Sequence, residues 1–590
     1  MLESTRDDRL TRQDWLLMTG LCLLFFGFSL IGGRPLTMHE GVLPQTAREM
    51  TADHDWVIPK NGGRPWLESP PLPQWITVGI ASLIGHCDEI WIVRIGPALM
   101  GTICVLLVAW MASHFFGRWI GLLAAAVHAT TYELAQYAWQ AEDEIFLCAI
   151  VTAAVSCFVW IEFVRKDSSA PGSRNFFGAR PWSLLALFIL LGMTNLAKGL
   201  LFGMVMSLVP IATFLLWNND WRRTTFYFWL PGWIVNALIA VAWPYAAYQR
   251  FPDVVELWLY DHQGRLDGAY ADITQPWYYY AKLLPNILAP WIAVVPVALA
   301  MTWRSALQQR FSAERFLWCW AIFVPLVFSI PSGKHHHYLL HAVTPWSILA
   351  ASVLPRLHAG LLSWPARLRT PSLAALTIGL PLVVVLWCLK KKLGWTSEPL
   401  LISSAVLPCL AVLFSWGLNQ KDGRIASGTL FTAVAAMFLV GHWLAGQSFD
   451  QSRHDARFLT QVREFIGTDK PLVIDGQSES LDEFRIQFSQ SDRARLVHNL
   501  SFLRDAALTS PELYVITRAR HEAELKEFGT PELVLRSEKT RREKSTGDRW
   551  ALFRLQVKPD LERVAADHLR VSPMQAMQRA SGPFLEPMRR

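Results

Sequence analysis

The chain has 590 residues, of which 52% are hydrophobic and only 17% are charged, and its mean hydropathy is +0.24. This composition excludes an ordinary set of soluble domains and is typical of a polytopic α-helical membrane protein. The net charge of +7 does not indicate a nucleic-acid-binding protein, because the basic residues lie in short segments between apolar runs and form no single patch. The eight cysteines mostly fall inside apolar runs, so we expect buried thiols and no disulfide framework.

The first apolar run, residues 16–31, follows a charged segment and lacks a small-residue cleavage pattern, so we predict a retained membrane anchor. Further runs of about 20 mostly apolar residues, the length that spans a bilayer, bring the total to roughly thirteen predicted spans. These spans are centred near Leu23, Val105, Ala125, Val155, Leu187, Leu208, Ile239, Ala293, Phe323, Ile348, Val383, Val406 and Ala436.

The distribution of Lys and Arg orients the spans, since cytoplasmic loops are enriched in these residues. All but one of the Lys/Arg-rich segments fall on one side, and the exception is "KKKLGW" from Lys390. The outer face then receives the long loop 33–89, the turn "WQAEDEIF", the segment from Tyr260 to Tyr280, the junction "PSGKHHHYLLH" and the chain after Gln447. The spans carry few charges at mid-depth, whereas ion-coupled transporters place charges there. The sequence therefore favours a site at the outer membrane face.

Two acids stand out in the outer loop 33–89. Small and apolar residues predict a short interfacial helix that begins near Glu40. A carboxylate at a helix N-terminus is stabilised by the helix dipole, so both a structural and a catalytic role fit Glu40. Glu68 lies within "GRPWLESPPLPQW", where four prolines limit the movement of the backbone. Such rigidity suits a preorganised site, and the alternative is an ordinary solvated loop acid.

After the last predicted span the sequence becomes charged and free of cysteine for roughly 140 residues, the size of one small domain. The runs "PLVIDG", "ELYVITR" and "WALFRLQV" predict strands, and "DARFLTQVREFI" and "RARHEAELKEFG" have helical spacing. We therefore expect a transmembrane domain over residues 1–446 and a small soluble α/β domain over 447–571. Residues 572–590 lack a clear period and are predicted to be a flexible tail.

The outer loop also carries an ordered series of motifs: His39-Glu40, "AREM" from Ala47, "DWVIP" from Asp55 and "ESPPLPQW" from Glu68. This series resembles the first extracytoplasmic loop of the glycosyltransferases with the polytopic C-type fold, the superfamily of protein O-mannosyltransferases and the aminoarabinose transferase of lipid A. Order and spacing are kept over about forty residues, well beyond the length of a short motif. The resemblance implies the C-type fold and transfer of a sugar from a polyprenyl-phosphate carrier to a lipid, protein or cell-envelope glycan. It places the reaction on the extracytoplasmic face of the membrane, and the topology implies a bacterial inner membrane or an equivalent secretory membrane.

Later segments resemble the same superfamily. Such a transfer needs a base for the proton of the acceptor and cations for the departing polyprenyl phosphate. For catalysis the resemblance implies the candidates Glu40, His39, Glu68 and Asp143, the last in "AEDEIF". For binding of the donor phosphate it implies Lys198 in "NLAKGLLFG", Arg265 in "DHQGRLDG", and Lys334 and Tyr338 in "SGKHHHYLLHAVTP".

The sequence departs from the family pattern at three positions. The family commonly has Asp-Glu where this chain has His39-Glu40, so either His39 replaces the base or Glu40 takes over, and we favour Glu40. Val42 and Ser69 stand where relatives of the lipid A transferase type often carry Arg and Lys. Either the donor differs from aminoarabinose, or Lys60, Arg64 and the outer histidines supply the missing charge.

The remaining expectations concern metals and alternative functions. Adjacent imidazoles point in different directions along a helix, so we expect the run from His335 to His337 to make hydrogen bonds or phosphate contacts, and not one metal site. His262 and Glu68 are candidate ligands of a divalent ion, although no cofactor is assigned with certainty. Two alternatives to the enzyme stay open: an inactive relative that serves as a lipid-binding scaffold, and a membrane transporter or flippase, which would predict repeat symmetry.

Overall fold

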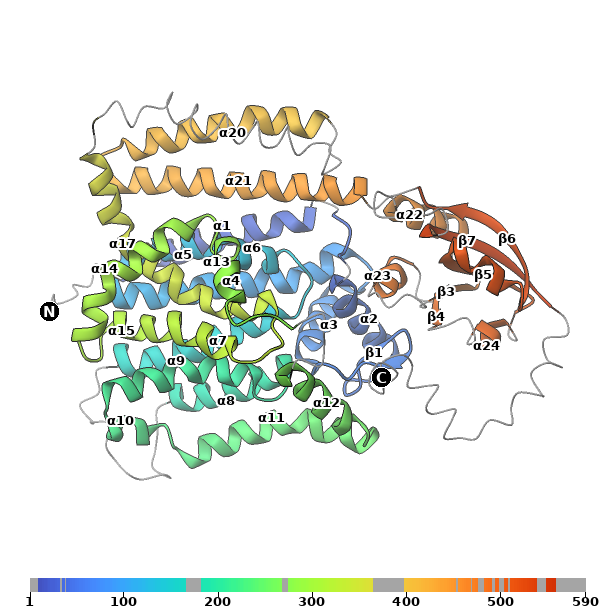
Figure 1. The fold of residues 1–590 in the computed structure, drawn as a ribbon, viewed down its shortest axis with the longest axis horizontal. Helices are drawn as coiled ribbons and strands as arrows, with labels where there is room; N and C mark the ends of the chain where they lie inside the picture. Colours follow the sequence, from blue (N-terminus) through green and yellow to red (C-terminus); the bar gives the residue numbers. More distant parts are fainter. Residues whose placement is uncertain are drawn as a thin grey trace. The chain divides into compact units, whose positions relative to one another are not determined.

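The computed structural model divides the chain into two compact units (Figure 1). Unit 1 comprises Met1–Gly33, Met50–Pro59 and Trp66–Ala445, and unit 2 comprises Arg34–Glu49, Lys60–Pro65 and Gly446–Arg590. The structure describes residues 9–31, 34–37, 39–165, 182–267, 274–363, 365, 397–452, 455–467, 470–475, 482–490, 494–497, 503–507, 510–538 and 548–558. The span expected near Val383 and the tail 572–590 lie outside these residues.

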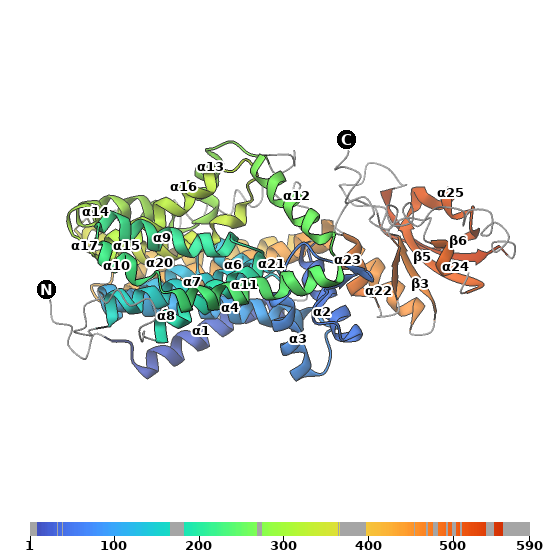
Figure 2. The same cartoon turned by 90° about the horizontal axis from the view of Figure 1, so that it is seen from below.

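Unit 1 is built around a row of neighbouring helices. The row runs α1 (Arg12–Ile31), α4 (Ile90–Phe116), α7 (Glu144–Val159), α8 (Trp182–Lys198) and α11 (Leu230–Arg250), each packed against the next. Figures 1 and 2 show these long helices lying along a common direction. Helix α7, in the middle of the row, is almost entirely buried, whereas α1 and α11 expose large apolar side chains. Such exposure on the outer helices suits contact with lipid, where apolar surface needs no burial within protein.

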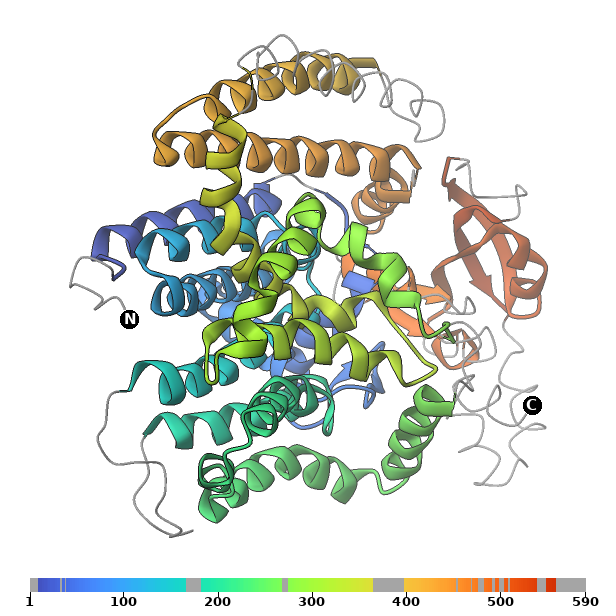
Figure 3. The ribbon, with the colours of Figure 1, turned by 60° about the vertical axis from the view of Figure 1, so that its left-hand side comes forward.

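A second layer covers the row. Helix α5 (Arg118–Ala129) packs on α4, α17 (Val343–Leu362) packs on α5, and α14 (Val294–Gln308) packs on α17. Figure 3 shows α8 and α11 as neighbours, at the end of the row away from α1. The remaining helices of unit 1 are α3 (Leu72–Ile84), α6 (Tyr132–Ala138), α9 (Phe202–Asn218), α10 (Trp221–Phe226), α12 (Val254–Asp267), α13 (Tyr279–Ile287), α15 (Ala313–Trp318), α16 (Val324–Ser329), α20 (Ser397–Leu418) and the first part of α21 (Gly423–Ser452).

Two glycines allow the close contact between α4 and α5. Gly117 ends α4 with a φ of 91°, so the chain reverses there. A Cβ at Gly121 would lie 2.7 Å from the Cβ of Ser113 and 2.8 Å from the carbonyl oxygen of Ala109. Only glycine therefore allows the two backbones to approach this closely.

Within the described residues, six helices are long and apolar enough to cross a membrane. The bent pair Trp291–Gln308 and Ala313–Ser329, with a bend of 118°, would make a seventh. Apart from Val383, each predicted span centre lies in a helical segment of the structure. Several of these helices are short, however: α5 has 12 residues and α8 and α9 have 17 each. At 1.5 Å per residue, α5 is too short to cross about 30 Å of hydrocarbon, so roughly thirteen spans stay a prediction.

Unit 2 contains a five-stranded sheet in the order β4-β3-β5-β7-β6. Its strands are β3 (Leu472–Asp475), β4 (Arg495–Val497), β5 (Glu512–Arg518), β6 (Gly529–Arg536) and β7 (Trp550–Val557), and its helices are α22 (Asp455–Ile466), α23 (Asp482–Ser489), α24 (Leu503–Ala507) and α25 (Glu522–Leu525). Strand β3 pairs in parallel with β4 and β5, and β7 pairs antiparallel with β5 and β6. The strands expected at "PLVIDG", "ELYVITR" and "WALFRLQV" are confirmed as β3, β5 and β7. The helix expected at "RARHEAELKEFG" is only the short α25, preceded by a 3-10 turn over Ala519–His521.

Part of the first outer loop folds within unit 2. This part holds a 3-10 turn (His39–Gly41), the beginning of α2 (Val42–Asp53), and a hairpin of β1 (Lys60–Asn61) and β2 (Arg64–Pro65). Arg48, from the "AREM" motif, donates hydrogen bonds to the carbonyl oxygens of Gln487, Phe488 and Gln490 at 3.0–3.2 Å. The motif arginine therefore joins α2 to the C-terminal end of α23 and to Gln490, which follows it.

Candidate active site

The polar centre of unit 1 lies where α7 begins and α8 ends. The amine of Lys198, the last residue of α8, lies 2.6 Å from Glu144 Oε1 and 3.0 Å from Asp143 Oδ2. Asp143 occupies the N-cap position of α7 without a capping hydrogen bond from its side chain, and Glu144 is the first residue of the helix. The helix dipole stabilises carboxylates at this end. Because α7 and α8 pack side by side, the lysine reaches both acids.

Histidines from the 3-10 segment η7 (His336–Ala342) complete this centre. His337 Nε2 lies 3.2 Å from Glu144 Oε1, and a hydrogen bond of 2.9 Å joins His336 Nε2 to the hydroxyl of Tyr137 on α6. The two adjacent rings thus have different partners. Among the described residues, no group of three or more His, Cys, Asp or Glu side chains is arranged to hold a metal ion. We call Asp143, Glu144, Lys198 and His337 the carboxylate–lysine cluster.

Burial changes the proton affinity of groups beside α7. Burial, and after it the charge of Glu144, raises the pKa of Asp143 to about 7, although Lys198 acts in the opposite direction. The pKa of Tyr137 is also raised, first by burial and then by the carboxylates of Glu142, Glu144 and Glu133. Asp143 can therefore accept a proton near neutral pH, which is what a general base requires.

Lys334 and Tyr338, both expected at the donor phosphate, are buried in unit 1. The amine of Lys334 donates to the carbonyl oxygens of Gln275 and Pro331, and burial lowers its pKa. The ring of Tyr338 packs on Phe202 with ring centroids 4.7 Å apart. The side chain of Lys334 thus joins its own loop to the loop of Gln275 by hydrogen bonds to backbone carbonyl oxygens.

His39 and Glu40 belong to unit 2 and differ in exposure. Glu40 is fully buried, and its Oε2 accepts hydrogen bonds of 2.9 Å from both the Arg34 guanidinium and the Thr37 amide. His39 is exposed. The contacts of Glu40 hold the turn before α2 and favour a structural role, whereas a base must reach its substrate.

Glu68 is an exposed residue in a loop that aromatic side chains hold. The indole of Trp258 on α12 donates to the carbonyl oxygen of Leu67 at 2.8 Å, and Leu67 itself is buried. The backbone next to Glu68 is therefore held in place by the bond between Trp258 and Leu67. His262 and Arg265 both lie in α12, but their side chains are outside the described part of the structure. The pairing of Glu68 with His262 and the phosphate contact of Arg265 stay predictions.

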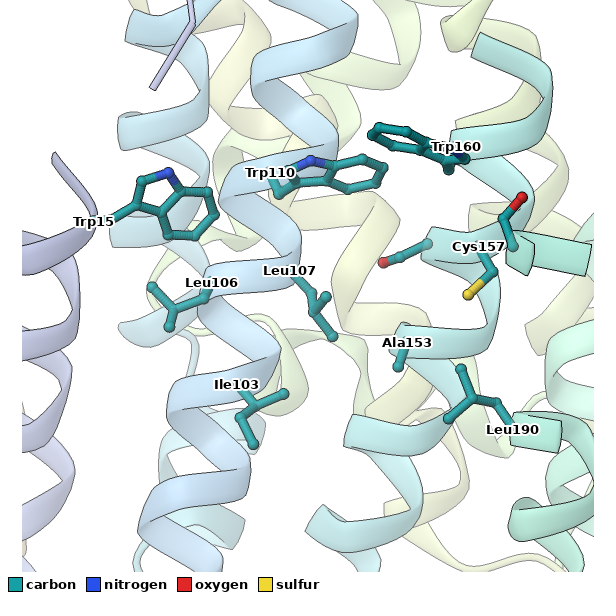
Figure 4. Close-up of a pocket in the computed structure, with 11 residues that line it drawn as sticks. Trp15, Ile103, Leu106, Leu107, Trp110, Ala153, Cys157, Trp160 and Leu190 are labelled. Carbon is teal, nitrogen blue, oxygen red and sulfur yellow. The ribbon is translucent and has the colours of Figure 1, made fainter. Parts of the chain in front are cut away.

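The apolar groove in Figure 4 is a separate feature of unit 1. It has a volume of about 520 Å³ and lies among α1, α4, α7 and α8, with Trp15, Trp110 and Trp160 among its lining residues. The rings of Trp110 and Trp160 stack with centroids 6.0 Å apart. None of the residues that line it belongs to the carboxylate–lysine cluster, so the groove is not the candidate active site.

Sequence reasoning missed Glu133, the second residue of α6. Its side chain is 1% exposed, and neither carboxylate oxygen has a hydrogen-bond partner. In the sequence Glu133 stands in "TTYELAQYAW" between two predicted spans, where an isolated acid is typical of a solvated turn. Glu133 has apolar and small neighbours in the sequence, and these neighbours were the available signal that its side chain is buried.

Comparisons with known proteins agree with this architecture. A family model described as dolichyl-phosphate-mannose-protein mannosyltransferase matches residues 47–260. An undecaprenyl phosphate-alpha-4-amino-4-deoxy-L-arabinose arabinosyl transferase of Edwardsiella ictaluri is 26% identical over 462 residues, which cover 78% of this chain and 76% of the relative. A second transferase of that name, from Sodalis glossinidius, is 26% identical over 438 residues, which cover 72% of this chain and 74% of the relative.

The fold agrees with a solved structure. The crystal structure of ArnT from Cupriavidus metallidurans bound to undecaprenyl phosphate has a TM-score of 0.69 and 17% identity, and the match covers 92% of this chain and 98% of that one. Fold and family together define the chain as a membrane glycosyltransferase of the C-type fold. Within that class, it is similar to the protein mannosyltransferases over residues 47–260 and to the aminoarabinose transferases over most of its length.

Proposed function

We propose that this protein transfers a sugar from an undecaprenyl-phosphate-linked donor to an acceptor at the outer face of a bacterial inner membrane. The observation that carries the proposal is the carboxylate–lysine cluster, two carboxyl groups and a lysine at the end of the apolar helix α7. Relatives named for transfer from undecaprenyl phosphate support the choice of carrier. The acceptor is a lipid, a protein or a cell-envelope glycan.

The chemistry is a displacement at the anomeric carbon. A lone pair of the acceptor forms the new bond to this carbon while the bond between the carbon and the phosphate oxygen breaks. The bonding electrons leave with undecaprenyl phosphate, and the acceptor proton passes to a carboxylate. Asp143 suits this role because burial raises its pKa to about 7. Its side chain is also 24% exposed, against 7% for Glu144.

Lys198 suits the leaving group. An ammonium beside the phosphate stabilises the negative charge that develops as the bond breaks. In the structure this ammonium is held by Asp143 and Glu144. Protonation of Asp143 by the acceptor weakens its pairing with Lys198, so the lysine becomes available to the phosphate as the charge develops. The proposed base, Asp143, and the proposed cation, Lys198, are in this way coupled through the hydrogen bond that joins them.

The proposed topology has roughly thirteen spans, with Asp143 and Lys198 at the extracytoplasmic ends of their helices. Residues 447–571 then form an extracytoplasmic soluble domain, and the sheet of unit 2 supports this division. Glu68 and His39, both exposed, are further candidates for contact with the acceptor. No observation favours the scaffold or flippase alternatives.

The test is transfer of radiolabelled sugar from a panel of synthetic polyprenyl-phosphate sugars by the purified protein in lipid. Wild type is compared with Asp143→Asn, Lys198→Met, Glu40→Gln and His39→Ala. Transfer that is lost in Asp143→Asn, while folding and donor binding persist, supports the proposed base. Full transfer by Asp143→Asn together with loss in His39→Ala would move the base to the first outer loop. If the wild-type protein binds a donor but neither transfers nor hydrolyses its sugar, the scaffold alternative is favoured.

A further inference from the structure

The sheet of unit 2 has a point at which its strand order reverses. From β3 the chain passes through α23 to β4 on one side of β3, and then through α24 to β5 on the other side. The three strands are parallel, so β3 and β5 end at the same edge of the sheet (Figure 1). In open α/β sheets, ligands bind outside the carboxyl ends of the strands at such a reversal. A ligand of unit 2 is therefore expected where β3 and β5 end.

The ends of these two strands carry three buried polar side chains. Asp475 is the last residue of β3, Thr517 is the second-last residue of β5, and His521 lies in the 3-10 turn that follows β5. Asp475 Oδ2 accepts a hydrogen bond of 2.5 Å from the Thr517 hydroxyl and lies 3.1 Å from His521 Nδ1. Asp475 is 3% exposed and His521 is 8% exposed. Because the carboxylate accepts, the histidine donates from Nδ1 and has Nε2 as an acceptor.

These buried side chains hold an arginine at the surface. Arg520 Nε donates to His521 Nε2 at 3.2 Å, so the guanidinium is tied through the histidine to the buried end of β3. The side chain of Arg520 is 56% exposed, and its other contact is a 3.3 Å pair with Asp548. Exposed pairs contribute little to stability, and fixing a long side chain costs rotamer entropy. An exposed arginine that is oriented in this way suits the binding of an anion.

A second guanidinium belongs to the same edge. Arg549 directly precedes β7, which runs antiparallel beside β5, and its carbonyl oxygen accepts a hydrogen bond of 2.9 Å from the amide of Ala519. The backbone of Arg549 is thus paired with the residue next to Arg520. Arg549 Nε is buried and has no hydrogen-bond partner among the described residues. The nearby Arg518, in contrast, donates to the carbonyl oxygen of Asp548 at 2.8 Å.

We propose that Arg520 and Arg549 bind a phosphate monoester at the edge of the unit 2 sheet where β3 and β5 end. A phosphate monoester carries a charge of about −1.5 to −2 near pH 7, which matches two guanidinium groups better than the single charge of a carboxylate does. Guanidinium groups also pair with phosphate oxygens in a bidentate way. His521 is a positioning residue, because it acts on the ligand through Arg520. The site lies within unit 2 and uses none of the groups proposed for sugar transfer.

The experiment measures how fast phenylglyoxal, a reagent for arginine, modifies each arginine of the full-length protein in phosphatidylcholine nanodiscs. Peptide mass spectrometry reads each arginine separately, so phosphate bound near Lys198 does not affect the result. One probe is glucose 6-phosphate, and the other is phosphatidic acid in the nanodisc, whose head group is a phosphate monoester. Glucuronate, a sugar with a carboxylate, is the control anion.

A phosphate probe present at about ten times its dissociation constant should slow modification of Arg520 and Arg549 about tenfold. Arg495 is the matched control arginine, because it is exposed at the start of β4, the opposite edge of the sheet, and its rate should not change. Protection by glucose 6-phosphate supports a site for soluble phosphates, and protection by phosphatidic acid alone supports a site for lipid head groups. Equal protection by glucuronate overturns the assignment to phosphate.

Variants separate binding from positioning. Arg520→Met should weaken phosphate binding by about 10- to 100-fold, read from protection of Arg549, and Arg495→Met should leave it unchanged. His521→Leu should weaken binding by about 3- to 10-fold and speed modification of Arg520 without phosphate, since the guanidinium is no longer held. His521→Gln keeps an acceptor for Arg520 and should restore part of both effects.

The result that overturns the inference is obtained on wild type and needs no variant. It is unchanged modification of Arg520 and Arg549 with both phosphate probes at millimolar concentration, while hydrogen exchange shows that β3 and β5 are folded. This result leaves the proposed sugar transfer intact, because that reaction is assayed with a polyprenyl-phosphate sugar and depends on residues of the carboxylate–lysine cluster.

Discussion

Replacing Lys198 by methionine tests the energetics of the carboxylate–lysine cluster. The side chain keeps its length and apolar stem but loses the charge that lies 2.6 Å from Glu144 and 3.0 Å from Asp143. At an effective dielectric constant of about 20, each attraction amounts to about 6 kcal/mol before the cost of desolvation. Removing one partner of a buried ion pair typically costs 3–5 kcal/mol. Lys198 is 18% exposed and Asp143 is 24% exposed, so solvent screens part of this energy. We expect a loss of about 3 kcal/mol.

The assay is equilibrium unfolding in mixed micelles by titration with a denaturing detergent. Asp143→Asn alone and the double variant Lys198→Met/Asp143→Asn complete a double-mutant cycle. The free energy of unfolding of the double variant should exceed that of Lys198→Met by at least about 1 kcal/mol, because one uncompensated carboxylate is removed. This value is about the smallest coupling expected of side chains in direct contact. A Lys198→Met protein within 0.5 kcal/mol of wild type, roughly the effect of an ordinary surface substitution, would refute the reasoning.

The pH dependence of Lys198→Met gives an independent check. In wild type, burial and the charge of Glu144 raise the pKa of Asp143 to about 7 although Lys198 opposes them. Without Lys198 this opposition is removed, so the pKa of Asp143 should be higher still. An acid whose pKa is higher in the folded than in the unfolded state binds its proton more tightly when folded. The variant should therefore be most stable below about pH 4, the unfolded pKa of Asp, and lose stability as the pH rises through 7. Stability that increases over this range would contradict the assignment.

Three further predictions concern other parts of the molecule. Arg48→Met should destabilise unit 2 by about 2–4 kcal/mol, since three carbonyl oxygens lose a charged donor. Hydrogen exchange of residues 482–490 measures this loss, and unchanged protection of these amides would contradict the prediction. Gly121→Ala should cost about 1–3 kcal/mol by overpacking, because its Cβ would meet Ala109 and Ser113 at under 3 Å; thermal unfolding checks this, with the exposed Gly79→Ala as control. With saturating donor, the transfer rate should fall tenfold per pH unit below about pH 7 if Asp143 must be ionised, whereas a rate that is flat between pH 5 and 8 excludes Asp143 as the base.

The strands of unit 2 could be predicted from the sequence because their apolar runs are short and bounded by turn residues. The three strands expected are β3, β5 and β7. The strands β4 and β6 were missed. In β6 the apolar run is only three residues long, it follows Pro531, and most residues of the strand are exposed or partly buried. Local patterns in this way reveal strands with buried faces, whereas an edge strand is specified by pairing with its neighbour.

The candidate site was accessible to sequence reasoning only in part. Motif order in the sequence identified Asp143 and Lys198, which the structure brings together. The partners of Glu40 could not be read in this way, because burial and the bond to Arg34 depend on how the loop folds. Glu133 was missed for a related reason, since the absence of a hydrogen-bond partner is a property of packing and leaves no mark in a local pattern.

The hydrogen bonds of Arg48 also constrain how the protein is made. Arg48 and its acceptor Gln490 are separated by 442 positions in the chain. At 5–20 residues per second, a ribosome needs roughly 20–90 s to synthesise the intervening segment. Throughout this time the start of α2 has none of the carbonyl partners that it holds in the finished protein. Unit 2 can therefore complete its fold only after the last membrane helix has been inserted, and the emerging first loop is exposed to proteases and chaperones until then.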